Sequence, residues 1–132
     1  MENLTIEGDF KHPEIAFDAE KGLLELKGNS IPERAEDFYA PILEWVKNYL
    51  QSPCEATTLN FKLIYLNSGS KRYILDILEI VKSSLLTGQA GGNNVTINWY
   101  YEEDDEDMLE MGESYKDLIY LPINFIPVNV ND

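Results

Sequence analysis

A predicted strand, a short polar break and a predicted helix follow one another between residues 57 and 85, and this succession constrains the fold more than any other part of the chain. Residues 57–67 alternate apolar and polar positions and then become apolar on both faces, as expected of an interior strand covered on two sides. After the SGS break, apolar side chains recur at the spacing of one buried helix face: Ile74, Ile77, Leu78, Val81 and Leu85. Gly88 favours the end of this helix.

The run VTINWYY, residues 95–101, consists largely of β-branched and aromatic residues and predicts another strand. A strand, a helix and a strand in succession favour a parallel pair joined by a right-handed crossover. We therefore expect residues 57–67 to lie centrally in the sheet, beside this later strand.

The flanking segments predict further strands. Residues 14–28 alternate apolar and polar positions on both sides of a turn that ends at Gly22, which indicates a β-hairpin. Leu4 to Ile6 predicts a short edge strand, and Leu118 to Phe125 predicts a closing strand in which Pro122 suits an edge position.

A second helix is predicted after the hairpin. Ser30 and Glu33 have the spacing of a capping box, in which each side chain satisfies a backbone N–H group at the start of a helix. Pro41 lacks a backbone donor, so the regular helix is expected to begin near it or to kink there. The apolar stripe of this helix is Phe38, Ile42, Trp45, Val46 and Tyr49.

Together these elements predict an α/β fold, a small mixed β-sheet with two main helices packed against it. The 132 residues suit a single domain spanning residues 1–132. The apolar content of 44% supports a packed core, which needs neither a disulfide nor a metal.

The charge of the chain is strongly negative and unevenly placed. Of the formal net charge of -14, residues 1–82 carry -5 and residues 83–132 carry -9, with Lys116 as their one cation. Nucleic acids and anionic membrane surfaces would be repelled and are not expected partners. The segment MENLTIEGDF lacks the pattern of a signal peptide, so we expect a cytoplasmic protein.

The residues that usually carry catalysis are scarce. Cys54 is the only cysteine, which rules out an internal disulfide and a cysteine-based zinc cluster. His12 is the only histidine, so a catalytic set of nucleophile and base is hard to assemble. His12 is expected to be an exposed loop residue, not a catalytic base. We therefore expect a protein that is not an enzyme and carries no cofactor.

The acidic run EEDDEDMLEMGE, residues 102–113, holds 8 of the 24 acids and leaves three interpretations open. It is a solvated loop running into a helix start, with Asp104 to Asp107 stabilised by the helix N-terminus, or it is a constitutive docking surface for a basic partner. The third is a divalent-cation site, in a binding protein or a hydrolase. The uninterrupted acidic block lacks the spacing and the central glycine of a calcium loop, which argues against that third interpretation.

The corner YLNSGSKR, residues 65–72, also has two interpretations. In the simpler one, Ser68 or Ser70 caps the following helix and Gly69 eases the turn. In the other, a hydroxyl here accepts a phosphate, which would sit at the positive end of the helix beside Lys71 and Arg72 and would change a protein contact.

The segments NFKLIYLNSGS, GNSIPE and NWYYEEDDEDMLEMGE together resemble the SiaC family of bacterial regulatory phosphoproteins, in that family's order and approximate spacing. The resemblance covers nearly the whole chain. It implies a STAS-like fold and a mode of regulation similar to that of anti-sigma-factor antagonists of the STAS type. In such proteins a hydroxyl residue between the central strand and the following helix is phosphorylated.

Carried onto this chain, the resemblance implies that Ser68 is the acceptor, with Ser70 as its rival. A protein kinase would add the phosphate and a metal-dependent phosphatase would remove it, and the unphosphorylated form would bind and activate a diguanylate cyclase, raising cyclic di-GMP. The free protein is expected to be a monomer. The predicted partner-binding corner comprises Asn67, Ser68, Gly69, Ser70, Lys71 and Arg72.

Overall fold

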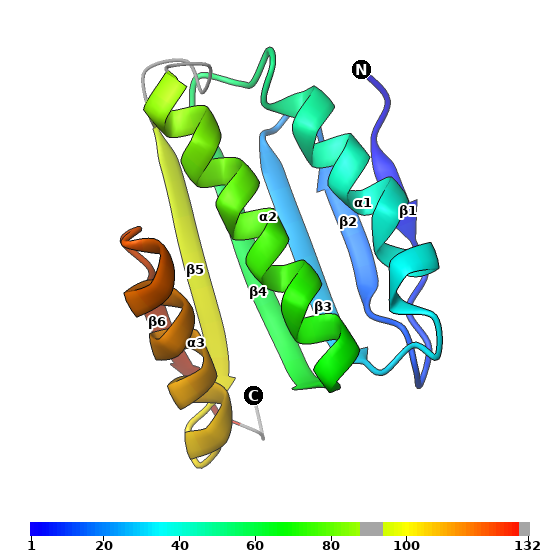
Figure 1. The fold of residues 1–132 in the computed structure, drawn as a ribbon, viewed down its shortest axis with the longest axis vertical. Coiled ribbons are helices and arrows are strands. Elements are labelled where there is room, and N and C mark those ends of the chain that lie inside the picture. The colour runs from blue at the N-terminus through cyan, green and yellow to red at the C-terminus, as the bar shows by residue number, and fades with distance from the viewer. Residues whose placement is uncertain (88–93, 130–132) are drawn as a thin grey trace.

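A six-stranded sheet carries all three helices on one face in the computed structural model, which describes residues 1–87 and 94–129 (Figure 1). The strands are β1 (Leu4–Ile6), β2 (Glu14–Asp18), β3 (Leu23–Ser30), β4 (Thr57–Leu66), β5 (Val95–Glu102) and β6 (Asn124–Val128). The helices are α1 (Ala35–Tyr49), α2 (Ser68–Thr87) and α3 (Glu106–Ile119). In these described ranges no helix is both long and apolar enough to cross a membrane.

The strands lie in the order in which they occur along the chain, from β1 to β6. The β1–β2 and β2–β3 pairs are antiparallel, whereas β3–β4, β4–β5 and β5–β6 are parallel. This confirms the mixed α/β class, the hairpin, the edge strand and the central position of β4. Because β3, β4 and β5 are parallel, their carboxyl ends and the loops that follow them gather at one edge of the sheet.

The core lies between the sheet and the helix layer. Phe61 of β4 and Trp99 of β5 are 1% exposed, and both are directed toward the helices. On α2, four of the five predicted face residues are buried, and the fifth, Leu85, is half-buried. The spacing of apolar residues therefore identified the inward face of this helix.

The other face of the sheet is polar, and no helix covers it within the described residues (Figure 1). Asn60 Nδ2 donates to Glu25 Oε2, Asn98 Nδ2 to Asn60 Oδ1, and Asn124 Nδ2 to Asn98 Oδ1. This row links four neighbouring strands. The prediction that residues 57–67 are covered on two sides was wrong, because the second face carries amides in place of apolar side chains.

The apolar residues at the end of β4 are exposed because the strand is irregular there. The β3–β4 register shifts between Gly28 and Asn29, which leaves Ile64 as an extra residue on β4. Pairing of β4 with β5 ends at Phe61 and Trp99, so the last residues of β4 pair with β3 alone. Ile64 is consequently 54% exposed and Tyr65 is 58% exposed.

The predicted capping box is wrong. Ser30 is the last residue of β3, pairs with Leu66 and is fully buried, so it cannot begin a helix. The helix α1 starts at Ala35, and Arg34 at its N-cap makes no side-chain capping bond. Pro41 lies inside α1 on its exposed side, where α1 continues past it.

The predicted closing strand at residues 118–125 is also wrong in its bounds. The helix α3 extends to Ile119, Tyr120 follows with a left-handed φ of 56°, and β6 begins only at Asn124. The edge strand contains Pro127, and Pro122 lies in the connection before it. Gly88, predicted to end α2, lies outside the described residues.

The helix α3 packs onto β5 through a glycine. A Cβ added at Gly112 would stand 2.6 Å from Cδ1 of the Trp99 ring, too close for any real contact. The Trp99 ring is fixed there because its Nε1 donates to the carbonyl oxygen of Met108 at 2.9 Å. Gly112 therefore allows the helix to lie directly on the indole.

We expect Gly112→Ala to lower the free energy of unfolding by about 1–3 kcal/mol, because the added methyl overpacks the Trp99 contact. Urea denaturation followed by tryptophan fluorescence measures this change. Ser114→Ala, at an exposed position of the same helix, is the control and should shift stability by less than about 0.5 kcal/mol. Equal stability of Gly112→Ala and the wild type would contradict this packing.

Candidate functional site at the β4–α2 corner

Ser68 is the first residue of α2, and its side chain is exposed. The predicted capping role of Ser68 or Ser70 belongs instead to Asn67. Its Oδ1 accepts the N–H of Ser70 at 2.9 Å, and its carbonyl oxygen accepts the N–H of Lys71 at 3.2 Å. Within residues 1–87 and 94–129 the Ser68 hydroxyl has no hydrogen-bond partner, so it is open to solvent.

Ser70, two residues later, is in the opposite situation, being fully buried. Its Oγ donates to the carbonyl oxygen of Ser30 at 3.0 Å and lies 2.7 Å from Ser30 Oγ. Since a hydroxyl has one hydrogen, Ser30 Oγ must donate to Ser70 Oγ, and Tyr39, at 2.6 Å, must donate to Ser30 Oγ. All three hydroxyl hydrogens are therefore used in one buried chain.

Burial also keeps the phenol of Tyr39 in its donating form. Removal from water is the largest cause that raises the pKa of Tyr39. The Tyr39 ring stacks on Tyr73 of α2, with centroids 5.4 Å apart. The start of α2 is thus joined both to the end of β3 and to α1.

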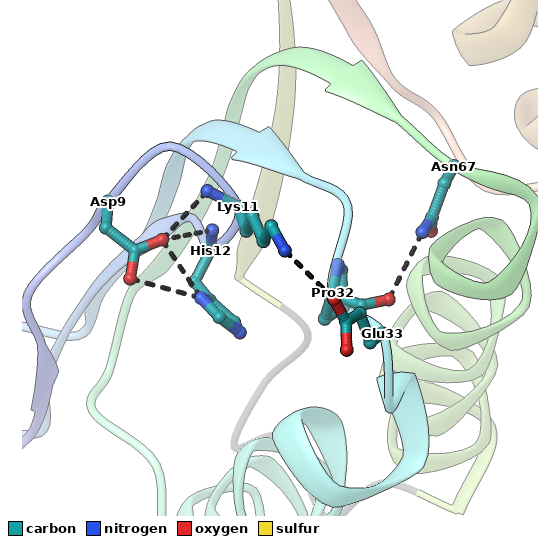
Figure 2. A network of polar contacts seen from close by, with 6 residues as sticks. All are labelled: Asp9, Lys11, His12, Pro32, Glu33 and Asn67. Atoms are coloured by element: carbon teal, nitrogen blue, oxygen red, sulfur yellow. Dashed lines mark hydrogen bonds and ion pairs between the residues drawn. The ribbon is translucent and has the colours of Figure 1, made fainter.

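Two further loops, residues 7–13 between β1 and β2 and residues 31–34 between β3 and α1, lie beside the corner (Figure 2). Asn67 Nδ2 donates to the carbonyl oxygen of Pro32, and the adjacent Glu33 pairs with Lys11 at 2.9 Å. His12 is partly exposed, and its Nδ1 bonds the carboxylate of Asp9, a bond that lowers the pKa of Asp9. Asp9 and His12 thus form a local loop contact.

The charges beside Ser68 are positive. Ser68, Lys71, Arg72 and Leu75 are spaced i, i+3, i+4 and i+7, so they share one face of α2. Lys71 and Arg72 are both exposed, and neither forms a salt bridge in the described part of the chain. Two cations are therefore available to an anion at the start of this helix.

The first turn of α2 is also tied to α3. Tyr115 donates its hydroxyl hydrogen to the carbonyl oxygen of Lys71 at 2.8 Å. Burial raises the pKa of Tyr115 well above the ordinary value, and the nearby Tyr39 adds to this effect, so the phenol stays protonated. The acidic helix and the Ser68 corner therefore form one connected surface.

The acidic run enters α3 as its first interpretation predicted. Asp105 is the N-cap residue, and its side chain accepts the N–H of Met108 at 3.1 Å. Glu106 and Asp107 lie in the first turn, where the helix dipole favours negative charge. Among the described residues no three His, Cys, Asp or Glu side chains converge as a metal site would require.

A groove of about 710 Å³ lies between α2 and α3. Lys71 and Arg72 line it from α2, and Asp107 and Glu110 line it from α3. Sequence reasoning missed this groove, because it depends on how far β4 separates from β5. The signal present in the sequence was the pair Ile64 and Tyr65, apolar residues beyond the regular alternation.

The comparison with protein families agrees with this architecture. The model of the SiaC family, described as regulatory phosphoproteins, matches residues 6–128. The chain belongs to the SiaC family. A curated relative in Pseudomonas aeruginosa strain UCBPP-PA14, named as an uncharacterized protein, is 28% identical over 117 residues, covering 89% of this chain and 90% of the relative.

Solved structures of SiaC from Pseudomonas aeruginosa share the fold. The apo-SiaC crystal structure is 27% identical, covers 96% of this chain and 99% of that chain, and superposes with a TM-score of 0.83. A chain in the crystal structure of the diguanylate cyclase SiaD with its activator SiaC is 26% identical, with a TM-score of 0.85. That match covers 95% of this chain and 99% of the other.

We expect Ser70→Ala to cost about 1–3 kcal/mol of stability, because the buried Ser30 hydroxyl loses the acceptor for its hydrogen. Thermal and urea unfolding measure this loss. Ser68→Ala is the matched control, the same change at an exposed position of the same turn, and should leave stability within about 0.5 kcal/mol of the wild type. Equal losses in both variants would contradict the assignment of the buried chain.

Proposed function

We propose that this SiaC-family protein is a phosphorylation switch without catalytic activity of its own, and that Ser68 accepts the phosphate. The observation that carries this proposal is the contrast between two serines in one turn. Ser68 is exposed and its hydroxyl has no hydrogen-bond partner in the described part of the chain, whereas Ser70 is buried and its hydroxyl hydrogen is already donated. A kinase would reach the first without unfolding the helix.

The surroundings of Ser68 suit a phosphate. A phosphoryl group on this first helical residue would lie near the positive end of the α2 dipole. Lys71 and Arg72, one turn along the same face, would supply charge-assisted hydrogen bonds. The modified protein would therefore keep its fold while the corner gains roughly two negative charges.

The target in this proposal is a diguanylate cyclase, which the unphosphorylated protein binds and activates. Support comes from the similar SiaC chain of Pseudomonas aeruginosa, whose crystal structure is of a complex with the diguanylate cyclase SiaD. A protein kinase and a metal-dependent phosphatase complete the cycle. We place this switch in the cytoplasm, with the free protein a monomer and the corner from Asn67 to Arg72 contacting its partners.

We expect incubation with its kinase, ATP and Mg²⁺ to add one phosphate, which mass spectrometry maps to Ser68. Ser68→Ala should abolish the modification. Ser70→Ala is the matched control and should be modified as the wild type is, at a temperature where it remains folded. Full phosphorylation of the Ser68→Ala variant would contradict the assignment of Ser68 as the phosphate acceptor.

We expect phosphorylation to weaken binding to the diguanylate cyclase at least tenfold, about 1.4 kcal/mol, because a contact surface gains negative charge. Calorimetric titration of the cyclase with the phosphorylated and unphosphorylated proteins measures this difference. Treatment with the phosphatase should restore the original affinity. Equal affinities before and after phosphorylation would contradict a charge switch.

A further inference from the structure

Phe10 is an exposed aromatic residue on the loop between β1 and β2. It is 76% exposed, although the large apolar residues of this chain mostly pack in the core. Single exposed apolar side chains are common on protein surfaces and need no explanation by themselves. Phe10 differs from such residues because the chain's own hydrogen bonds fix the backbone that carries it.

The carboxylate of Asp9 fixes this backbone. Its Oδ1 accepts the N–H of Lys11 and the N–H of His12, both at 2.8 Å. The backbone N–H of Asp9 donates to the carbonyl oxygen of His12 at 2.9 Å, which closes a tight turn around Phe10. We call residues 9–12 the Phe10 turn. It presents the aromatic ring to solvent from one fixed backbone conformation.

The Phe10 turn is joined to the same residues as the Ser68 corner. The N–H of Ile31 donates to the carbonyl oxygen of Lys11 at 2.8 Å, and the N–H of Asn67 donates to that of Ser30 at 3.0 Å. Two hydrogen-bonded chain spacings therefore separate Lys11 from Asn67, or about 10 Å. Figure 2 shows Lys11 and Asn67 on either side of Pro32 and Glu33.

This separation is smaller than the area that a protein partner covers. A specific interface buries about 800 Å² on each partner, which corresponds to a disc of about 16 Å in radius. A kinase must place its active site over Ser68, the neighbour of Asn67. A disc of that size centred on Ser68 includes the Phe10 turn, so the kinase covers both.

A hollow of about 530 Å³ lies beside the Phe10 turn. Its lining includes charges of both signs that pair within the chain, Lys11 with Glu33 and Arg34 with Asp37. The exposed ring and this polar hollow together have the composition of an interface, with an aromatic anchor and a polar rim. A rigid aromatic anchor loses little conformational freedom on binding, so it contributes strongly to affinity.

We propose that the Phe10 turn is a docking site for the protein kinase, and that Phe10 is the anchor that fills an apolar pocket of that kinase. This inference rests on the proposed function for the kinase and for Ser68 as its acceptor. It adds a recognition element on a separate loop. The kinase thereby selects the folded protein, in which this loop and Ser68 lie side by side.

The first test is steady-state phosphorylation by the kinase at saturating ATP and Mg²⁺, with the concentration of this protein varied. Phe10→Ala should raise KM at least tenfold and leave kcat within twofold, because the anchor binds the kinase without contacting the transferred phosphoryl group. The matched control is Tyr120→Ala, at an aromatic residue after α3 that is 84% exposed, and both of its constants should equal those of the wild type. Circular dichroism verifies that both variants fold.

A second set of variants tests whether the fixed backbone matters. Asp9→Ala removes the acceptor of two backbone N–H groups and should raise KM at least threefold, because the ring is no longer held ready for binding. Asp9→Asn keeps an acceptor oxygen and should restore KM to within twofold of the wild type. In the Phe10→Ala background, Asp9→Ala should add no further increase. A further increase there would contradict the role of Asp9 in holding Phe10.

The outcomes separate this inference from the proposed function. If Phe10→Ala is phosphorylated on Ser68 with the KM of the wild type, the docking site is overturned and the acceptor stands. If Phe10→Ala raises KM while mass spectrometry maps the phosphate to another residue, the docking site stands and Ser68 is overturned. An equal loss of affinity for the diguanylate cyclase would overturn the kinase as the occupant. A kinase that does not modify the wild-type protein would overturn both.

Discussion

The buried chain from Tyr39 through Ser30 to Ser70 determines how the functional corner is built. It joins α1, the end of β3 and the first turn of α2 through hydroxyl groups that have no contact with water. In such a setting an unmatched donor is costly, so the three elements are held in one relative position. The start of α2 is consequently rigid where it presents Ser68 to solvent.

The sequence predicted most of the fold because its strong periodicities coincide with the elements that bury most apolar surface. The alternation in residues 14–28, the central strand and the inward face of α2 are all set by side chains that pack in the core. The place of residues 65–72 between a strand and a helix singled out this corner, and the family resemblance, confirmed over residues 6–128, favoured its interpretation as a phosphate site. Ser68 as the acceptor and the kinase and phosphatase as partners remain predictions.

The errors share a physical origin. The closing strand was predicted to begin too early because the end of α3 was not recognised. The buried face of α3 consists only of Met108, Gly112, Tyr115 and Ile119, and the glycine and the surrounding acids conceal its helical spacing of apolar residues. The capping box failed because Ser30 satisfies its hydroxyl through Tyr39 and Ser70, partners far along the chain. The groove lies where β4 has parted from β5, because their pairing ends at Phe61 and Trp99, and the end of strand pairing cannot be read from local composition.

The difference in burial between the two serines also bears on how such a switch can diverge among species. The side chain at position 68 is exposed, so exchange between serine and threonine there adds a methyl group at the surface. Position 70 is enclosed, and the same exchange would place a methyl group in a full interior. Position 68 therefore tolerates either hydroxyl residue, while position 70 is held constant by packing.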